Sequence, residues 1–359
     1  MKKLIVLCFA LLAMTLSARA SELPRELTDA LPPEAGELLE GIDPTDVQGF
    51  GSGVGRILER MGAQAGEILR QRVRGAASVL LVVVLCGAVD GFCQGTGSGR
   101  AAVFLPMAGA LSVTMAAAGS LDSLIGLGAE TIGELNIFSK ALLPTLAAAT
   151  AAAGAVTAAA FQQVTTVFLA ELLMELIDGL LMPLVYLYIG TLTAACCLPE
   201  NRLGAIAEGL KKVITWILTT ALLLFTVYLS VTRVIAGTAD GAAVKMTKAA
   251  ISGAVPVVGG IISEAAETVL AGAGLLKNTV GVFGMLAILA VCAYPFLQLG
   301  IQYLLYKLTA FLAAAVGAPG LCKLIDGLGG AFGLVLGMTG SCALLLLISV
   351  LSSVAAVTP

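Results

Sequence analysis

The stretch AAISGAVPVVGGIISEAAETVLAGAGLLKNTVGVF, residues 249–283, decides the fold. It is too apolar for an ordinary loop and too interrupted for an ordinary membrane span. Pro256 lacks an amide hydrogen, and Gly259 and Gly260 accept backbone dihedrals that are closed to other residues. The sequence therefore predicts a helix that breaks in this stretch.

A second helix is expected directly after the break. Ser263 can cap it, and Glu264 and Glu267 then lie in its first turn, where the positive end of the helix dipole favours carboxylates. Lys277 and Asn278 add polar groups further along. Irregular backbone at membrane depth must be satisfied by protein or by a water-filled cavity. The prediction is thus a re-entrant functional element, or else a kinked amphipathic helix at the interface or a packing element.

Composition defines the protein class. Hydrophobic residues make up 58% of the 359 residues and charged residues 12%, compared with roughly a quarter charged in soluble domains. The chain is predicted to be all-α, a polytopic transmembrane helix bundle in contact with the lipid bilayer. It has no basic tract of the kind that binds nucleic acid.

The N-terminal region is predicted to lie outside the membrane. Residues 1–20 have the features of a signal peptide: two lysines, an apolar run and the small-x-small site Ala18-Arg19-Ala20. An uncleaved anchor is the alternative, and it places the next segment on the same side. Residues 21–75 form a polar segment of short helices and turns, in which residues 49–55 are expected to be a flexible joint and residues 54–73 an amphipathic helix.

The transmembrane domain is predicted to cover residues 76–359, with seven or eight spans. Charge placement leaves their orientation open, because Lys211 and Lys212 before one span and Arg233 after it both favour the cytoplasm. The spans are expected at about residues 76–92, 101–120, 141–163, 180–198, 213–235, 281–317 and 331–356, where 281–317 is either two spans or one long tilted helix.

Three acidic residues, Glu171, Glu175 and Asp178, are spaced so that they share one helix face. An acidic face in contact with lipid would be costly, and no basic partner is obvious nearby in the sequence. The face is predicted to lie at the aqueous interface, with a polar lumen or ion path as the alternative.

Near the C-terminus, Gly329, Gly333 and Gly337 recur at four-residue spacing. Small residues on one face let two helices approach closely, so we expect a helix contact there. The sequence LIDGL occurs at residues 176–180 and again at 324–328, a repeat that chance explains in such leucine-rich sequence.

Several classes of chemistry have no residues to support them. The chain contains no histidine, which removes zincin motifs, haem ligation by histidine and histidine-based triads. It also has neither a GxSxG elbow nor a P-loop lysine motif, and its cysteines lack CxxC spacing. No enzyme activity, cofactor or metal site is expected.

The central stretch and its continuation resemble a known family. The resemblance covers about residues 100–355, and the residues that carry it are Pro256 to Gly260, Glu267 to Val269, Lys277-Asn278, Val280-Gly281 with Gly284, and Tyr306 to Leu308. On these residues the chain resembles the stage III sporulation protein AE family of spore-forming bacteria.

The resemblance implies a polytopic protein of the mother-cell membrane around the forespore. Its implied partners are the other proteins of the stage III sporulation A operon and, indirectly across the intermembrane space, stage II sporulation protein Q. The chain would then be a membrane-embedded core subunit of a trans-envelope channel, or feeding tube, with a permease-like part as one implication. Its broken segment, residues 249–283, would then line or gate the path. The family supplies no catalytic residues to transfer. The alternatives are a stand-alone secondary transporter and a non-conducting membrane scaffold.

Overall fold

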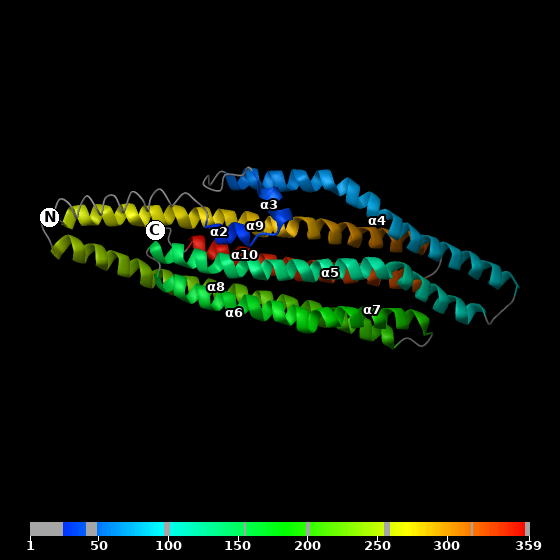
Figure 1. Cartoon of the computed structure of the whole chain (residues 1–359). Helices are drawn as coiled ribbons and strands as arrows, with labels where there is room; N and C mark the ends of the chain where they lie inside the picture. Colours follow the sequence, from blue (N-terminus) through cyan, green and yellow to red (C-terminus); the bar gives the residue numbers. More distant parts are fainter. Residues whose placement is uncertain are drawn as a thin grey trace.

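The computed structural model is an elongated bundle of long helices (Figure 1). Every regular element in the part of the chain that it describes is helical, so the predicted all-α class is confirmed. The described residues are 24–40, 49–96, 101–153, 156–198, 202–254, 259–316 and 319–355. The predicted signal peptide, residues 1–20, lies outside them.

Two short helices precede the first long one. Helices α2 (Arg25–Asp29) and α3 (Pro33–Leu39) pack against the bundle, with Leu27 in its core. Helix α4 (Gly49–Thr96) begins within the glycine run that was predicted to be a flexible joint, and that prediction is wrong. Each glycine lowers helix propensity by about 1 kcal/mol, and packing of this end of α4 against the bundle, with Ile57 buried, opposes that cost.

The middle of the chain forms two long helical rods. Helix α5 (Ala101–Ala152) runs without interruption through residues that were predicted to be a span, an acidic connector and the start of another span. Helices α6 (Val156–Leu176) and α7 (Met182–Cys197) are joined by the π-helical turn η1 (Ile177–Leu181), so they also form one rod.

The predicted break lies between α8 (Leu203–Ala254) and α9 (Gly259–Ala315), and residues 255–258 between them are outside the described part. Ser263 does not cap a helix as predicted, because α9 already begins at Gly259. Helix α9 continues past Pro295 to Ala315, so the described part of the predicted run 281–317 holds one long helix and not two spans. The last helix is α10 (Pro319–Ala355).

Within the described part of the chain, six helical segments are long and apolar enough to cross a membrane, compared with the seven or eight spans that were predicted. The difference arises in α5, which joins two predicted spans into one helix. Its 52 residues correspond to about 78 Å at 1.5 Å per residue, whereas the hydrocarbon core of a bilayer is about 30 Å thick. Because α5 is longer than the bilayer is thick, its charged residues can lie outside the bilayer while the helix continues without a break.

Helices α9 and α10 form the centre of the bundle. Within their most apolar windows 72% and 61% of residues are buried, against 17–28% in the other four segments. Helix α10 packs against α5, α6, α7 and α8 as well as α9, while α4 covers another side of α9. The C-terminal hairpin is therefore enclosed by the helices that precede it in the chain.

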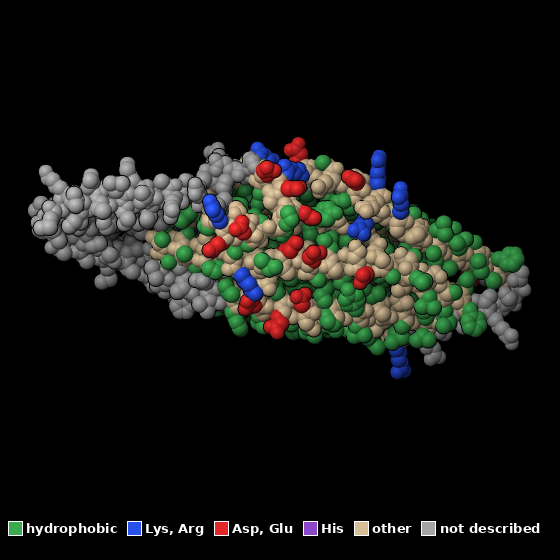
Figure 2. Space-filling model, viewed as in Figure 1, with side chains coloured by type: hydrophobic (Ala, Val, Ile, Leu, Met, Phe, Trp, Pro, Cys, Tyr) green, Lys and Arg blue, Asp and Glu red, His purple; other side chains and the backbone are tan. Residues whose placement is uncertain are grey.

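The surface divides into an apolar part and an acidic part. Acidic side chains gather across the middle of the face in Figure 2, and hydrophobic side chains dominate the part to their right. Large exposed apolar side chains occur on several helices and include Phe92 on α4, Phe104 on α5, Trp216 on α8 and Phe311 on α9. Exposed apolar side chains of this size are typical of a lipid-facing surface.

Candidate functional site

The residues predicted to line or gate a channel are only partly described. Pro256 lies outside the described residues, and Lys277 is buried in α9 with 3% of its surface exposed. The other predicted residues, which are Gly259, Gly260, Glu264, Glu267 and Asn278, lie within α9. Of these, the structure describes the surroundings of Asn278 only. Their role in gating stays a prediction.

The predicted acidic face lies on the surface of the bundle. Glu171, Glu175 and Asp178 are all exposed, the last of them in the π-helical turn η1. The expectation that no basic partner lies nearby is wrong, because Lys140 Nζ on α5 is 3.3 Å from Glu171 Oε1 on α6. The two residues are 31 positions apart in the sequence, and only the packing of α5 against α6 brings them together.

The glycines of α10 lie along its packed side. A Cβ atom added at Gly329 would be 3.1 Å from Tyr306 Cβ, and one at Gly333 would be 3.2 Å from the Tyr303 ring. At Gly337 the nearest atom, Leu218 Cδ2 on α8, would be 3.8 Å away. Of these three glycines, Gly329 and Gly333 are therefore the ones at which α10 closely approaches α9, and their missing side chains leave room for two tyrosines.

A buried polar row runs along α9 and consists of Gln298, Gln302 and Tyr306. Their four-residue spacing places them on one helix face, and they are at most 6% exposed. Gln302 and Tyr306 interact with each other one helical turn apart, but among the described residues neither the Gln302 amide atoms nor the Tyr306 hydroxyl makes a hydrogen bond of normal length and angle. A buried unpaired polar group costs about 1–3 kcal/mol, so these atoms are suited to hold water or a polar solute.

Two contacts define the ends of this row. At one end, Arg72 on α4 donates a hydrogen bond to the Gln298 side-chain oxygen. At the other, the Tyr306 ring packs edge-on against Phe332 of α10, with ring centroids 5.1 Å apart. The row therefore lies between α4, α9 and α10, in the most enclosed part of the bundle.

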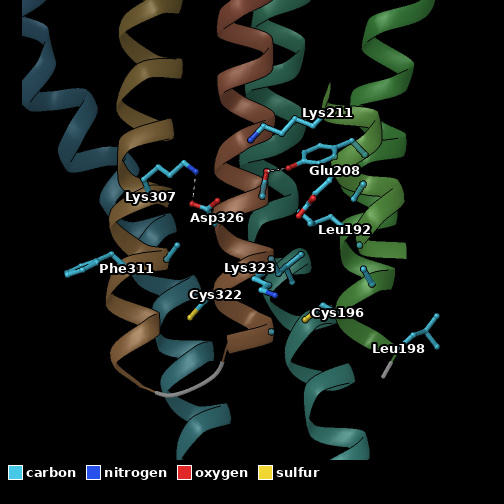
Figure 3. Close-up of a pocket in the computed structure, with 18 residues that line it drawn as sticks. Leu192, Cys196, Leu198, Glu208, Lys211, Lys307, Phe311, Cys322, Lys323 and Asp326 are labelled. Carbon is cyan, nitrogen blue, oxygen red and sulfur yellow. Dashed lines mark hydrogen bonds and ion pairs between the residues drawn. The ribbon is translucent and has the colours of Figure 1, made fainter. Parts of the chain in front are cut away.

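A cavity of about 770 Å³ lies close to the far end of the row, between α7, α8, α9 and α10 (Figure 3). We call it the charged pocket. Its apolar wall includes Leu192, Leu198, Phe311 and Leu324. Its polar and charged lining residues come from all four helices: Tyr188, Glu208, Lys211, Lys307, Lys323 and Asp326.

The polar groups of the pocket are held in defined positions. Lys307 Nζ lies 2.5 Å from Asp326 Oδ1, and the Tyr188 hydroxyl donates a 3.1 Å hydrogen bond to the Gly327 carbonyl. A Cβ atom at Gly330 would be 3.3 Å from Lys211 Nζ, so the absent side chain leaves space for that ammonium group. The arrangement fits recognition of a charged or polar group. Among the described residues, no cluster of three His, Cys, Asp or Glu side chains is placed to hold a metal ion.

No residue of the charged pocket was predicted from the sequence to be a site residue. Asp326 and Gly327 belong to the second LIDGL copy, which was attributed to chance, and the two copies do differ in structure. Asp178 of the first copy is exposed on a π-helical turn, while Asp326 of the second is paired with Lys307. Ionisable residues within apolar runs are the sequence signal that could have identified the pocket.

Comparison with known proteins gives a consistent result. A family model described as stage III sporulation protein AE matches residues 51–357. Stage III sporulation protein AE of Bacillus subtilis (strain 168) is 27% identical over 207 residues, which are 58% of this chain and 52% of that protein. The chain thus spans about half the length of this curated relative. No solved structure matches the chain.

Proposed function

The chain belongs to the stage III sporulation protein AE family, and on that premise we propose that it is a membrane-embedded core subunit of a trans-envelope channel between mother cell and forespore. The proposed location is the mother-cell membrane that surrounds the forespore. The proposed partners are the other proteins of the stage III sporulation A operon, with stage II sporulation protein Q reached indirectly across the intermembrane space.

The buried polar row on α9 is the observation that supports a conducting role. A helix that served only to pack the bundle would gain stability from apolar side chains at its most enclosed face. Gln302 instead places an amide with 0% exposure there, without a hydrogen bond of normal length and angle to the described residues. Polar groups inside a membrane bundle typically mark paths for ions or solutes. The charged pocket lies close to this row at the Tyr306 end, where Lys307 lines it.

Substitution of Gln302 by methionine tests this proposal. Methionine has a similar volume and no amide to leave unpaired, so Gln302→Met is expected to keep or raise thermal stability. If Gln302 serves conduction, the variant will assemble with its partners in sporulating cells but will yield at least tenfold fewer mature spores.

Leu297→Met, on another face of α9, is the matched control and is expected to sporulate normally. Normal sporulation of Gln302→Met would contradict a conducting role for the row and would favour the non-conducting scaffold. A stand-alone transporter is distinguished differently, because it would move its substrate in cells that lack the other operon proteins.

A further inference from the structure

The charged pocket combines an excess of positive charge with an apolar opening. Three lysines and two acids line it, which leaves a formal charge of +1. Lys307 is paired with Asp326, whereas Lys211 and Lys323 make no ion pair with the described residues. Leu198 and Phe311 at its edge are 49% and 75% exposed.

Two helix N-termini add to the positive potential of the pocket. Helix α8 begins at Leu203 and α10 at Pro319, and the second residue of each, Gly204 and Gly320, lines the pocket. The first backbone N–H groups of a helix have no partner within the helix and lie at the positive end of its dipole. Together with the lysines, they form an arrangement that favours a multivalent anion such as a phosphoryl group.

We propose that the charged pocket binds a phosphoryl anion, and that its occupant is the headgroup of an anionic phospholipid. Lys323 contacts the phosphate beside the first turns of α8 and α10, Lys211 adds positive charge further along the pocket, and the acyl chains leave across Leu198 and Phe311 into the bilayer. A free phosphate compound offers the same charged group without the chains. The apolar rim favours the lipid, because a small soluble anion would gain nothing from exposed leucine and phenylalanine side chains.

The position of the pocket along the bundle supports this occupant. It lies at the end where α8 and α10 begin. Arg202 directly precedes α8, and Lys211 and Lys323 line the pocket itself. Basic residues near the ends of spans are typical of the cytoplasmic side, where anionic lipids give the leaflet its negative surface potential.

The test is a titration of the purified full chain, in neutral detergent, with fluorescently labelled phosphatidylglycerol. Each lysine near an anionic headgroup contributes roughly a fivefold change in affinity, so Lys211→Gln combined with Lys323→Gln is expected to weaken binding about 25-fold. Lys212→Gln is the matched control, because Lys212 is an exposed neighbour that does not line the pocket. Glu208→Gln is expected to tighten binding up to roughly fivefold, a gain that misfolding cannot produce.

Two competitors identify the source of the phosphate. If millimolar inorganic phosphate leaves the labelled lipid bound and unlabelled phosphatidylglycerol displaces it, the site is a lipid site. Displacement by inorganic phosphate would retain the anion site but assign it to a soluble ligand. Equal binding of phosphatidylcholine and phosphatidylglycerol would overturn the proposal. So would an equal loss of affinity in Lys212→Gln and in the double variant, or no gain of affinity in Glu208→Gln.

Discussion

Lys307 Nζ on α9 lies 2.5 Å from Asp326 Oδ1 on α10, and this ion pair joins the two central helices at the charged pocket. The same ammonium group is 5.7 Å from the centroid of the Tyr303 ring on its own helix. The side chains of Lys307 and Asp326 are 32% and 52% exposed, so the pair is at the edge of the bundle core. The ion pair therefore holds the α9 and α10 walls of the pocket together, while it contributes little to the free energy of unfolding.

Reversal of this pair tests that view. Asp326→Lys places two ammonium groups together, and we expect the free energy of unfolding in detergent to fall by about 1 kcal/mol, since partly exposed pairs contribute roughly 0.2–1 kcal/mol. The double variant Lys307→Asp with Asp326→Lys is expected to recover most of the loss. A double-mutant cycle measured by chemical unfolding provides the coupling free energy. Coupling indistinguishable from zero would show that the two side chains do not interact.

The glycine spacing on α10 predicts opposite effects at two positions. Gly329→Ala is expected to lower stability by about 1–2 kcal/mol, because the new Cβ would lie 3.1 Å from Tyr306 Cβ, an atom fixed close to the backbone. Gly337→Ala is expected to raise stability by about 0.5–1 kcal/mol, because its site has ordinary clearance and alanine favours the helix. Equal effects at the two positions would contradict the close contact of α9 and α10 at Gly329.

Composition and spacing predicted the helical membrane class and the positions of the α10 glycines. They failed on the number of spans because Asp122 and Glu130 indicated a connector, whereas both are exposed on α5 beyond the length that a bilayer needs. Hydropathy places the end of a membrane span where charged residues begin. The helix itself continues past such residues when its opposite face, with Leu124 and Ile132, is buried in the bundle.

The site was harder to predict than the fold. Lys307 and Asp326 are 19 residues apart on opposite sides of the turn between α9 and α10, so no helical periodicity connects them. The four-residue spacing of Gln298, Gln302 and Tyr306 is visible in the sequence. Which face of α9 is enclosed depends on how α4 and α10 pack, and a single sequence does not contain that information.

The acidic face provides a third prediction. We expect the triple variant Glu171→Gln, Glu175→Gln and Asp178→Asn to change the free energy of unfolding by less than about 1 kcal/mol, because the Lys140–Glu171 pair is about half exposed. Sporulation is expected to continue, since the three side chains lie on the surface of the bundle. Circular dichroism melting and spore counts measure the two effects. A folded variant that fails to form spores would place this face at an interface or along an ion path.

The orientation of the bundle can be tested at the two ends of α8. This helix has 52 residues, about 78 Å, and exposed apolar side chains from Ile206 to Val231, so its two ends lie on opposite sides of the membrane. Arg202, Lys211 and Lys212 near the first end of α8 favour the cytoplasm for that end, and the predicted export of the N-terminus agrees with it. The connection between α8 and α9 is then outside.

Single cysteines in a chain whose native cysteines are replaced report on these ends. In intact vegetative cells that express the chain, where the outer face of its membrane is open to the medium, a membrane-impermeant maleimide is expected to label Pro256→Cys but to leave Gly317→Cys unlabelled, and permeabilised cells are expected to label both. The reverse pattern would invert the orientation and place the charged pocket at the outer leaflet. Labelling at positions 252–268 that changes when the operon partners are deleted would further support a channel-lining element that depends on the complex. Uniform protection across these positions would make the segment a packing element, because a channel-lining backbone has to be reached by water.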